Sequence, residues 1–196
     1  MNRAIVQFRE NIRHVRNLRG IYTALRGLTT GALDLSDILR AQIVMAVSAM
    51  DTYVHAVARI GMVEIYVGAR PATDAYRHFA VSLDCASQLA GGATGALETE
   101  IRRLHGFQTF QDPKKIADAV RLVSAIQLWN SVSAALGEPP DDVKQSILLI
   151  VQRRNKIAHE ADVDPVFGGR WPINEPMVDN AIDRIERVCE VIQTLL

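Results

Sequence analysis

The chain of 196 residues contains 22 Lys plus Arg and 22 Asp plus Glu, so it is long enough for one well-buried domain and its formal net charge is zero. Zero net charge excludes a globally basic protein that attracts nucleic acid over its whole surface, and any contact with RNA has to be local. Neither Cys85 nor Cys189 belongs to a disulfide or zinc pattern, and no segment resembles a signal peptide or approaches a membrane-spanning apolar run, so we expect a soluble, cytoplasmic protein without membrane contact.

The first two predicted helices are long. Apolar residues recur every three or four positions over residues 5–25, which predicts an amphipathic helix of about 25 residues. A second helix begins after Asp34 or Ser36, either of which can cap it, and runs to about Val67. Its many small and apolar residues indicate deep burial.

The middle of the chain predicts three more helices. One covers about residues 73–90 and ends at the glycine-rich turn 91–95. A shorter helix follows over about 96–104, and a longer one over 113–136 starts with Asp112 as its cap and a proline in its first turn. The glycine-rich turn is the best candidate for an internal hinge.

The last part of the chain predicts two helices separated by an irregular loop over residues 162–172. One helix starts at Asp141 and Asp142, whose carboxylates suit a helix amino end, and the other starts near Asn174. Strand signals are scarce throughout. The sequence therefore predicts an all-α fold, a single-domain bundle of about six to seven helices that spans residues 1–196.

A motif with useful chemistry lies in the carboxyl half of the helix that starts at Asp141. Arg154, Asn155 and His159 combine a guanidinium that binds phosphate, an amide, and an imidazole that transfers protons near neutral pH. Such a trio needs no metal and no cofactor. Arg154 and His159 point roughly 140° apart around the helix, so one helix presents an incomplete site. A second copy packed across a two-fold axis completes it, which predicts a homodimer.

The bare spacing of arginine and histidine is a weak signal, because Arg9 and His14 match it too. The later match differs in having an asparagine directly after the arginine, an apolar stripe on the helix before it and an acidic segment after it, over residues 160–165. An alternative interpretation of Arg154 and His159 is an ordinary helix carboxyl end, where cationic side chains interact favourably with the helix dipole.

The Arg-Asn-x-x-x-His order of residues 154–159, near the end of a late helix, resembles the mark of the HEPN superfamily of all-α domains. The stretches 50–55, 154–165 and 176–182 look most like the RiboL-PSP-HEPN subgroup. The resemblance implies a metal-independent endoribonuclease of the toxin, phage-defence or RNA-processing type, with its active cleft between two protomers. It also implies an antitoxin or sensor protein as a partner. In some members a tyrosine two positions after the motif histidine is modified by the partner antitoxin. This chain has Ala161 at that position, which puts regulation by such a modification in doubt.

In the chemistry that the resemblance implies, the RNA 2′-hydroxyl attacks the adjacent phosphorus and leaves 2′,3′-cyclic phosphate and 5′-hydroxyl ends. His159 is the general acid or base, Arg154 stabilises the phosphorane, and Asn155 orients the site. Two other interpretations stay open. One is a non-catalytic HEPN-like module that binds RNA or a partner protein through the same groove, and the other is a purely structural dimer module.

Asp51 and His55 form a candidate auxiliary pair, because they lie one helical turn apart and the carboxylate can orient the imidazole. The alternative is a structural hydrogen bond, which is the commoner role of such a pair. No Glu-x-x-His pair indicates a di-iron bundle, and no phosphate-cradling glycine loop indicates a nucleoside triphosphatase. We therefore predict no metal site and no cofactor.

Residues around the motif are candidates for an RNA-binding rim. Arg153, Lys156 and Arg170 supply positive charge, and the loop residue Trp171 is a candidate for stacking on a base. The alternatives are a solvated charged face and an aromatic side chain that fills the core.

Overall fold

The computed structural model describes residues 1–196, and its nine helices confirm the predicted all-α fold. The helices are α1 (Asn2–Leu28), α2 (Ser36–Tyr66), α3 (Asp74–Arg77), α4 (Leu83–Ala90), α5 (Gly95–His105), α6 (Pro113–Arg121), α7 (Leu128–Leu136), α8 (Pro140–His159) and α9 (Glu175–Leu195). The one β pairing is an isolated antiparallel bridge between Val163 and Arg170. There are more helices than the predicted number of about six to seven, because two predicted helices are each divided into two.

The predicted helix over residues 73–90 is divided into α3 and α4. Each part has its own capping side chain: the Thr73 hydroxyl accepts from the backbone N–H of Tyr76, and the Ser82 hydroxyl accepts from that of Cys85. Serine and threonine compete with a helix for its backbone N–H groups. The apolar spacing alone therefore overestimated the length of this element.

The predicted helix over residues 113–136 is divided into α6 and α7 by side chains from another part of the chain. The Thr73 hydroxyl donates to the carbonyl of Leu122 (3.1 Å), and Arg70 Nη1 donates to the carbonyl of Val123 (3.4 Å). A continuous helix would use these carbonyls for its own hydrogen bonds. The division depends on residues that are distant in sequence, so the local pattern contains no sign of it.

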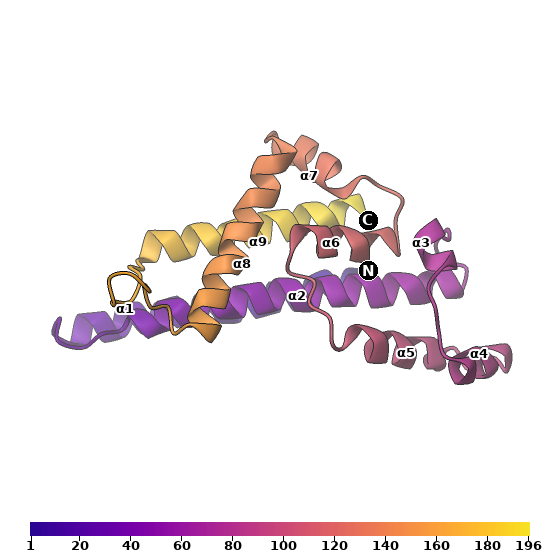
Figure 1. Cartoon of the computed structure of the whole chain (residues 1–196), viewed down its shortest axis with the longest axis horizontal. Helices are drawn as coiled ribbons and strands as arrows, with labels where there is room; N and C mark the ends of the chain where they lie inside the picture. Colours follow the sequence, from indigo (N-terminus) through magenta and orange to yellow (C-terminus); the bar gives the residue numbers. More distant parts are fainter.

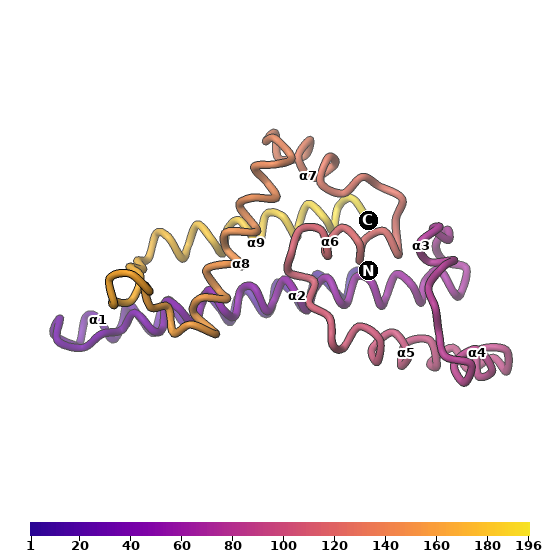
Figure 2. The backbone as a smooth tube through the Cα atoms, in the orientation of Figure 1, coloured from indigo at the N-terminus to yellow at the C-terminus, as the bar shows by residue number.

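Helix α2 forms the centre of the fold and runs along the long axis of the molecule (Figure 1). It packs against α1, α5, α6, α8 and α9. The tube in Figure 2 shows α1 antiparallel to α2, with α8 crossing it.

The composition of α2 differs from the expectation that no segment approaches a membrane-spanning run. Its mean hydropathy reaches 1.3 over an 18-residue window, so α2 is long and apolar enough to cross a membrane by length and composition alone. In the fold, 50% of that window is buried. A helix surrounded by other helices is also apolar on most of its sides, because most of its side chains contact apolar neighbours.

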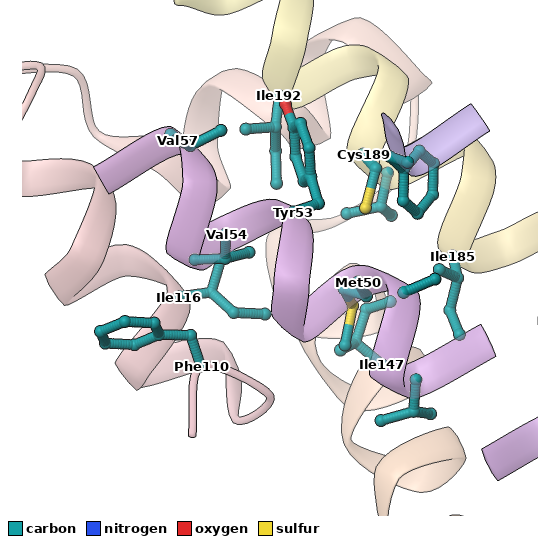
Figure 3. Packing of buried hydrophobic residues seen from close by; sticks show 14 of the residues in the cluster. Met50, Tyr53, Val54, Val57, Phe110, Ile116, Ile147, Ile185, Cys189 and Ile192 are labelled. Carbon is teal, nitrogen blue, oxygen red and sulfur yellow. The ribbon is translucent and has the colours of Figure 1, made fainter. Parts of the chain in front are cut away.

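The hydrophobic core surrounds α2 on several sides. Figure 3 shows Tyr53 of α2 beside Ile192 of α9, and Met50 of α2 beside Ile147 of α8. None of these four side chains is more than 1% exposed. Phe110, from the segment between α5 and α6, joins the same core and is 4% exposed. This burial anchors the segment that precedes α6 against the middle of α2.

Most helix starts agree with the sequence analysis. Asp112 caps α6 as predicted, and α9 starts directly after Asn174, close to its predicted start; each of these two side chains accepts a hydrogen bond from a backbone N–H of the first turn. Helix α2 begins after Asp34 as predicted, but the cap position holds Leu35, without a capping side-chain hydrogen bond, rather than Asp34 or Ser36. The Asp34 carboxylate still accepts from the Ser36 backbone N–H (2.8 Å), so it stabilises the turn that leads into the helix.

Candidate functional site

The motif occupies the last turns of α8, which begins one residue before its predicted start and ends at His159. Val143, Ile147 and Val151 bury one side of this helix in the core. Because α8 is held along that side and crosses α2 (Figure 1), the directions of its remaining side chains are fixed. The motif therefore lies on a rigid element, in the carboxyl half of the helix as predicted.

Arg154 is connected to α2 through a glutamine. Its Nη2 donates to Gln111 Oε1, and Gln111 Nε2 donates to Asp51 Oδ2 (2.9 Å). The backbone N–H of Phe110 donates to the other oxygen of Asp51 (2.6 Å). The structure thus brings together Arg154 of the motif and Asp51 of the predicted auxiliary pair. Sequence reasoning missed Gln111, since a buried glutamine in a loop has no spacing pattern that marks it.

The second member of the auxiliary pair lies beside Asp51 without a hydrogen bond to it. His55 Nε2 is 3.7 Å from Asp51 Oδ1, and the His55 ring packs against Phe110 with 4.5 Å between ring centroids. A second imidazole, His105, lies 6.4 Å from His55 between ring centroids; it is buried and its Nδ1 has no hydrogen-bond partner. Burial lowers the pKa of His105, and His55 lowers it further.

The two histidines have no third side chain with which to form a metal site. Nowhere in the chain do three or more His, Cys, Asp or Glu side chains lie close enough together to hold a metal ion. The surroundings of His55 and His105 are instead aromatic, because Phe110 and Phe79 contact the His105 ring edge-on at 5.2 and 5.7 Å between centroids. This cluster lies next to the Asp51 end of the network.

Asn155 and His159 are both exposed, and neither side chain has a hydrogen bond or ion pair within the chain. They differ in this from Arg154, which is half-buried and engaged. The exposed pair lies one turn apart on one side of α8, as the helical spacing requires. The motif therefore has one anchored residue and two that face outward.

Arg153 does not form part of an open rim. Its Nη2 donates to Asp162 Oδ2 (2.8 Å) and to the carbonyls of Trp171 (3.3 Å) and Pro172 (3.1 Å). Arg40 of α2 donates to the same Asp162 oxygen (2.7 Å). Burial lowers the pKa of the Arg153 guanidinium, although Asp162 acts in the opposite direction. Arg153 thus ties the loop after the motif to α8, and its charge is already paired.

The other predicted rim residues are also engaged, but closer to the surface. Arg170 Nη1 pairs with Asp37 Oδ1 (2.6 Å) across the loop. Lys156 Nζ lies 5.0 Å from the centre of the Trp171 ring, which is a cation–π contact, and the Trp171 side chain is half-buried. Lys156 thus covers one face of the ring that was predicted to stack on a base.

The second arginine–histidine match, on α1, has a different environment. Arg9 forms two hydrogen bonds to Glu190 of α9, both 2.6 Å long, and Glu190 raises its pKa. His14 Nε2 lies 3.1 Å from Glu10 Oε1. Both cationic positions of this match therefore face carboxylates of the same chain, unlike the motif on α8.

None of the most pronounced hollows of the single chain lies at the motif. The five most pronounced surface hollows have volumes between about 320 and 950 Å³, and none of these is lined by Arg154, Asn155 or His159. The largest lies between the start of α1, α2 and α5. A substrate as large as RNA would therefore meet the motif on an open surface of one chain.

The chain matches no protein-family model, no curated protein and no solved structure. Any functional conclusion therefore depends on the residues and their geometry. The strongest chemical arrangement among them is an anchored guanidinium and an unengaged imidazole on the last turns of one helix.

Proposed function

We propose that this protein is a metal-independent endoribonuclease of the HEPN type that acts as a homodimer in a toxin, phage-defence or RNA-processing role. One contrast supports the proposal: Arg154 is held by a neutral amide, whereas His159 is exposed and has no partner in its own chain. A guanidinium whose charge is not cancelled and a free imidazole are the two groups that metal-free cleavage of a phosphodiester needs.

The proposed reaction is an internal transfer. A base removes the proton of the RNA 2′-hydroxyl, the 2′-oxygen bonds to the adjacent phosphorus, and the bond from phosphorus to the 5′-oxygen breaks as that oxygen takes up a proton. His159 moves protons as general acid or base, and Arg154 stabilises the charge that grows on the phosphorane oxygens. Asn155 orients the RNA or the facing helix, because its amide does not titrate. The products carry 2′,3′-cyclic phosphate and 5′-hydroxyl ends.

The proposal includes a second copy of the chain because one copy offers only part of a site. Arg154 and His159 point roughly 140° apart around α8, so they cannot both face one phosphate. Two copies packed antiparallel across a two-fold axis bring Arg154 of one protomer toward His159 of the other. The RNA then binds in the cleft between them, and a cytoplasmic location and an antitoxin or sensor partner stay predictions.

Incubation of the purified protein with total RNA and transfer RNA in EDTA tests the activity. The wild type is expected to cleave, and His159→Ala is expected to bind RNA without cleaving it. Arg154→Ala should lower the cleavage rate by at least about 100-fold and also weaken binding. Arg9→Ala and His14→Ala are the matched controls, with the same spacing on α1, and should cleave like the wild type. Cleavage by His159→Ala, or products without cyclic-phosphate ends, contradicts the mechanism.

Mixing the two inactive variants tests the composite site. A dimer of one Arg154→Ala chain and one His159→Ala chain contains one site with both groups intact. Half of randomly mixed dimers are of this kind, so the mixture should recover about a quarter of the wild-type rate. No recovery, although the chains exchange, would place both groups of a site on one protomer.

A second candidate function is RNA or partner-protein binding without cleavage. This function is favoured because none of the five most pronounced hollows of one chain is lined by Arg154 or His159, and an open surface binds but does not exclude water from a reaction. RNA binding by wild type and His159→Ala alike, with no product from either, would support this function. An effect of both substitutions on stability or association alone would support a purely structural dimer module.

A further inference from the structure

We infer that Gln111 is the positioning residue for Arg154, and that it holds the guanidinium while leaving its positive charge free for a phosphate. The inference rests on the proposed function and adds a residue outside the motif. Gln111 precedes α6, is 7% exposed, and reaches Arg154 from a segment far away in the sequence.

The two partners of the Gln111 amide set its orientation. Nε2 donates to Asp51 Oδ2 (2.9 Å), and Oε1 accepts from Arg154 Nη2. A carboxylate only accepts and a guanidinium only donates, so a flipped amide would meet repulsion on both sides. Asp51 is itself held by the backbone N–H of Phe110 (2.6 Å). Asp51 therefore decides which end of the amide faces Arg154.

The neutral partner is what separates Arg154 from the other arginines in the interior. Four arginine side chains that are between 5% and 20% exposed pair with carboxylates. They are Arg40, Arg70, Arg153 and Arg184. A carboxylate cancels the charge of a guanidinium, and a carbonyl oxygen does not. With Gln111 between them, Asp51 orients Arg154 without neutralising it, and the remaining N–H donors stay available for phosphate oxygens.

Such positioning matters most in the transition state. The charge on a phosphorane grows at defined points, and a displacement of about 1 Å in a catalytic group costs about 100-fold in rate. A free arginine side chain also has to lose rotamer freedom when it binds, and Gln111 has already removed part of that freedom. The predicted consequence is a contribution to kcat rather than to the binding of RNA.

Two variants test the inference on RNA cleavage. Gln111→Leu removes the contact, and Gln111→Glu places a carboxylate against Arg154. Gln111→Leu should lower kcat with transfer RNA by about 100-fold with little change in KM. Gln111→Glu should lower kcat by a similar factor and also raise KM, because its carboxylate cancels the charge that binds phosphate. The matched control is Gln108→Leu, because Gln108 is exposed in the same segment and donates only to the carbonyl of Leu104 (3.4 Å). It should cleave like the wild type.

A double variant separates positioning from general damage to the fold. Asp51→Asn and Gln111→Leu act through the same guanidinium, so the combination should be no slower than Gln111→Leu alone. If the rate losses of Asp51→Asn and Gln111→Leu multiply in the double variant, the inference is overturned. A wild-type kcat in Gln111→Leu would overturn it as well. Either result leaves the proposed ribonuclease function standing if the wild type cleaves RNA.

A measurement that does not need activity covers the case in which the wild type cleaves no RNA. NMR spectroscopy of isotope-labelled arginine side chains reports the rotation of the Arg154 guanidinium, with Arg154→Lys to assign the signal. Rotation should be hindered in the wild type and in Gln108→Leu, and free in Gln111→Leu. Equal rotation in all of these proteins overturns the inference. The proposed function is tested separately, by RNA cleavage, so the failure of one is distinguishable from the failure of the other.

Discussion

Asp162 supports the loop that follows the motif, and replacing it with asparagine should strongly destabilise the protein. Its side chain is 0% exposed, and one of its oxygens accepts from Arg40 Nε (2.7 Å) and Arg153 Nη2 (2.8 Å). The backbone N–H of Asp162 donates to the Lys156 carbonyl (3.0 Å), and its own carbonyl accepts from the Trp171 N–H (2.8 Å). One buried carboxylate therefore connects α2, α8 and the loop.

The expected magnitude follows from the charges that remain. Asp162→Asn keeps the side-chain shape and tolerates the left-handed backbone at this position (φ 59°), so it removes mainly the negative charge. Two arginine side chains, 5% and 20% exposed, then lose the buried carboxylate that they share, and only the exposed Asp37 stays near Arg40, at 3.9 Å. Removing one partner of a buried ion pair costs about 3–5 kcal/mol. For a chain of this size, that loss lowers the Tm by roughly 10 °C.

Denaturant and thermal unfolding of the wild type and Asp162→Asn measure this loss. The matched control is Glu160→Gln, which removes a carboxylate two residues away that is exposed and has no side-chain partner. The control should change the free energy of unfolding by no more than about 0.5 kcal/mol. If Asp162→Asn is as stable as the control, the reasoning that the ion pairs of Asp162 with Arg40 and Arg153 are shielded from water is refuted.

Other predictions concern the packing and pH dependence of the fold. Gly61→Ala should cost about 1–3 kcal/mol in unfolding experiments, because a Cβ there would lie 2.5 Å from Val123 Cγ1. Gly20→Ala, with nothing within 4 Å of the new Cβ, should instead gain about 0.5–1 kcal/mol, and equal effects of the two would contradict the close approach. Ala161→Gly should raise stability by about 1 kcal/mol, since Ala161 has a φ of 52°, and a loss would contradict this. Burial lowers the pKa of His105 below its usual value, so the unfolded chain binds a proton at higher pH than the folded chain, and stability should fall as the pH decreases below about 7. His105→Phe should show a smaller fall, and the same fall in both proteins would refute this.

The long helices were predictable because their apolar periodicity continues over many turns. Helices α1, α2, α8 and α9 lie within a few residues of their predicted ranges. The division between α6 and α7 was not predictable, since Thr73 and Arg70 bond to carbonyls that are about fifty residues away in sequence. The division between α3 and α4 does have a local cause, the capping side chain of Ser82, which the sequence analysis did not use.

The candidate site likewise has one part that local sequence determined and one part that the tertiary structure determined. The relative directions of Arg154, Asn155 and His159 follow from the helical period, which is a local property, so the sequence by itself determined which groups the last turns of α8 present. Gln111 entered the site only through the fold, because Phe110 is buried against α2 and places the next residue between Asp51 and Arg154.

The charges around the site were decided by the tertiary structure alone. In the sequence, Arg153 and Arg154 are adjacent cations with the same chemistry. In the fold, Arg153 is paired with a buried carboxylate and Arg154 with a neutral amide. The interaction between two charges depends on their distance and on the solvent between them, and both are set by residues that the chain brings together from far apart.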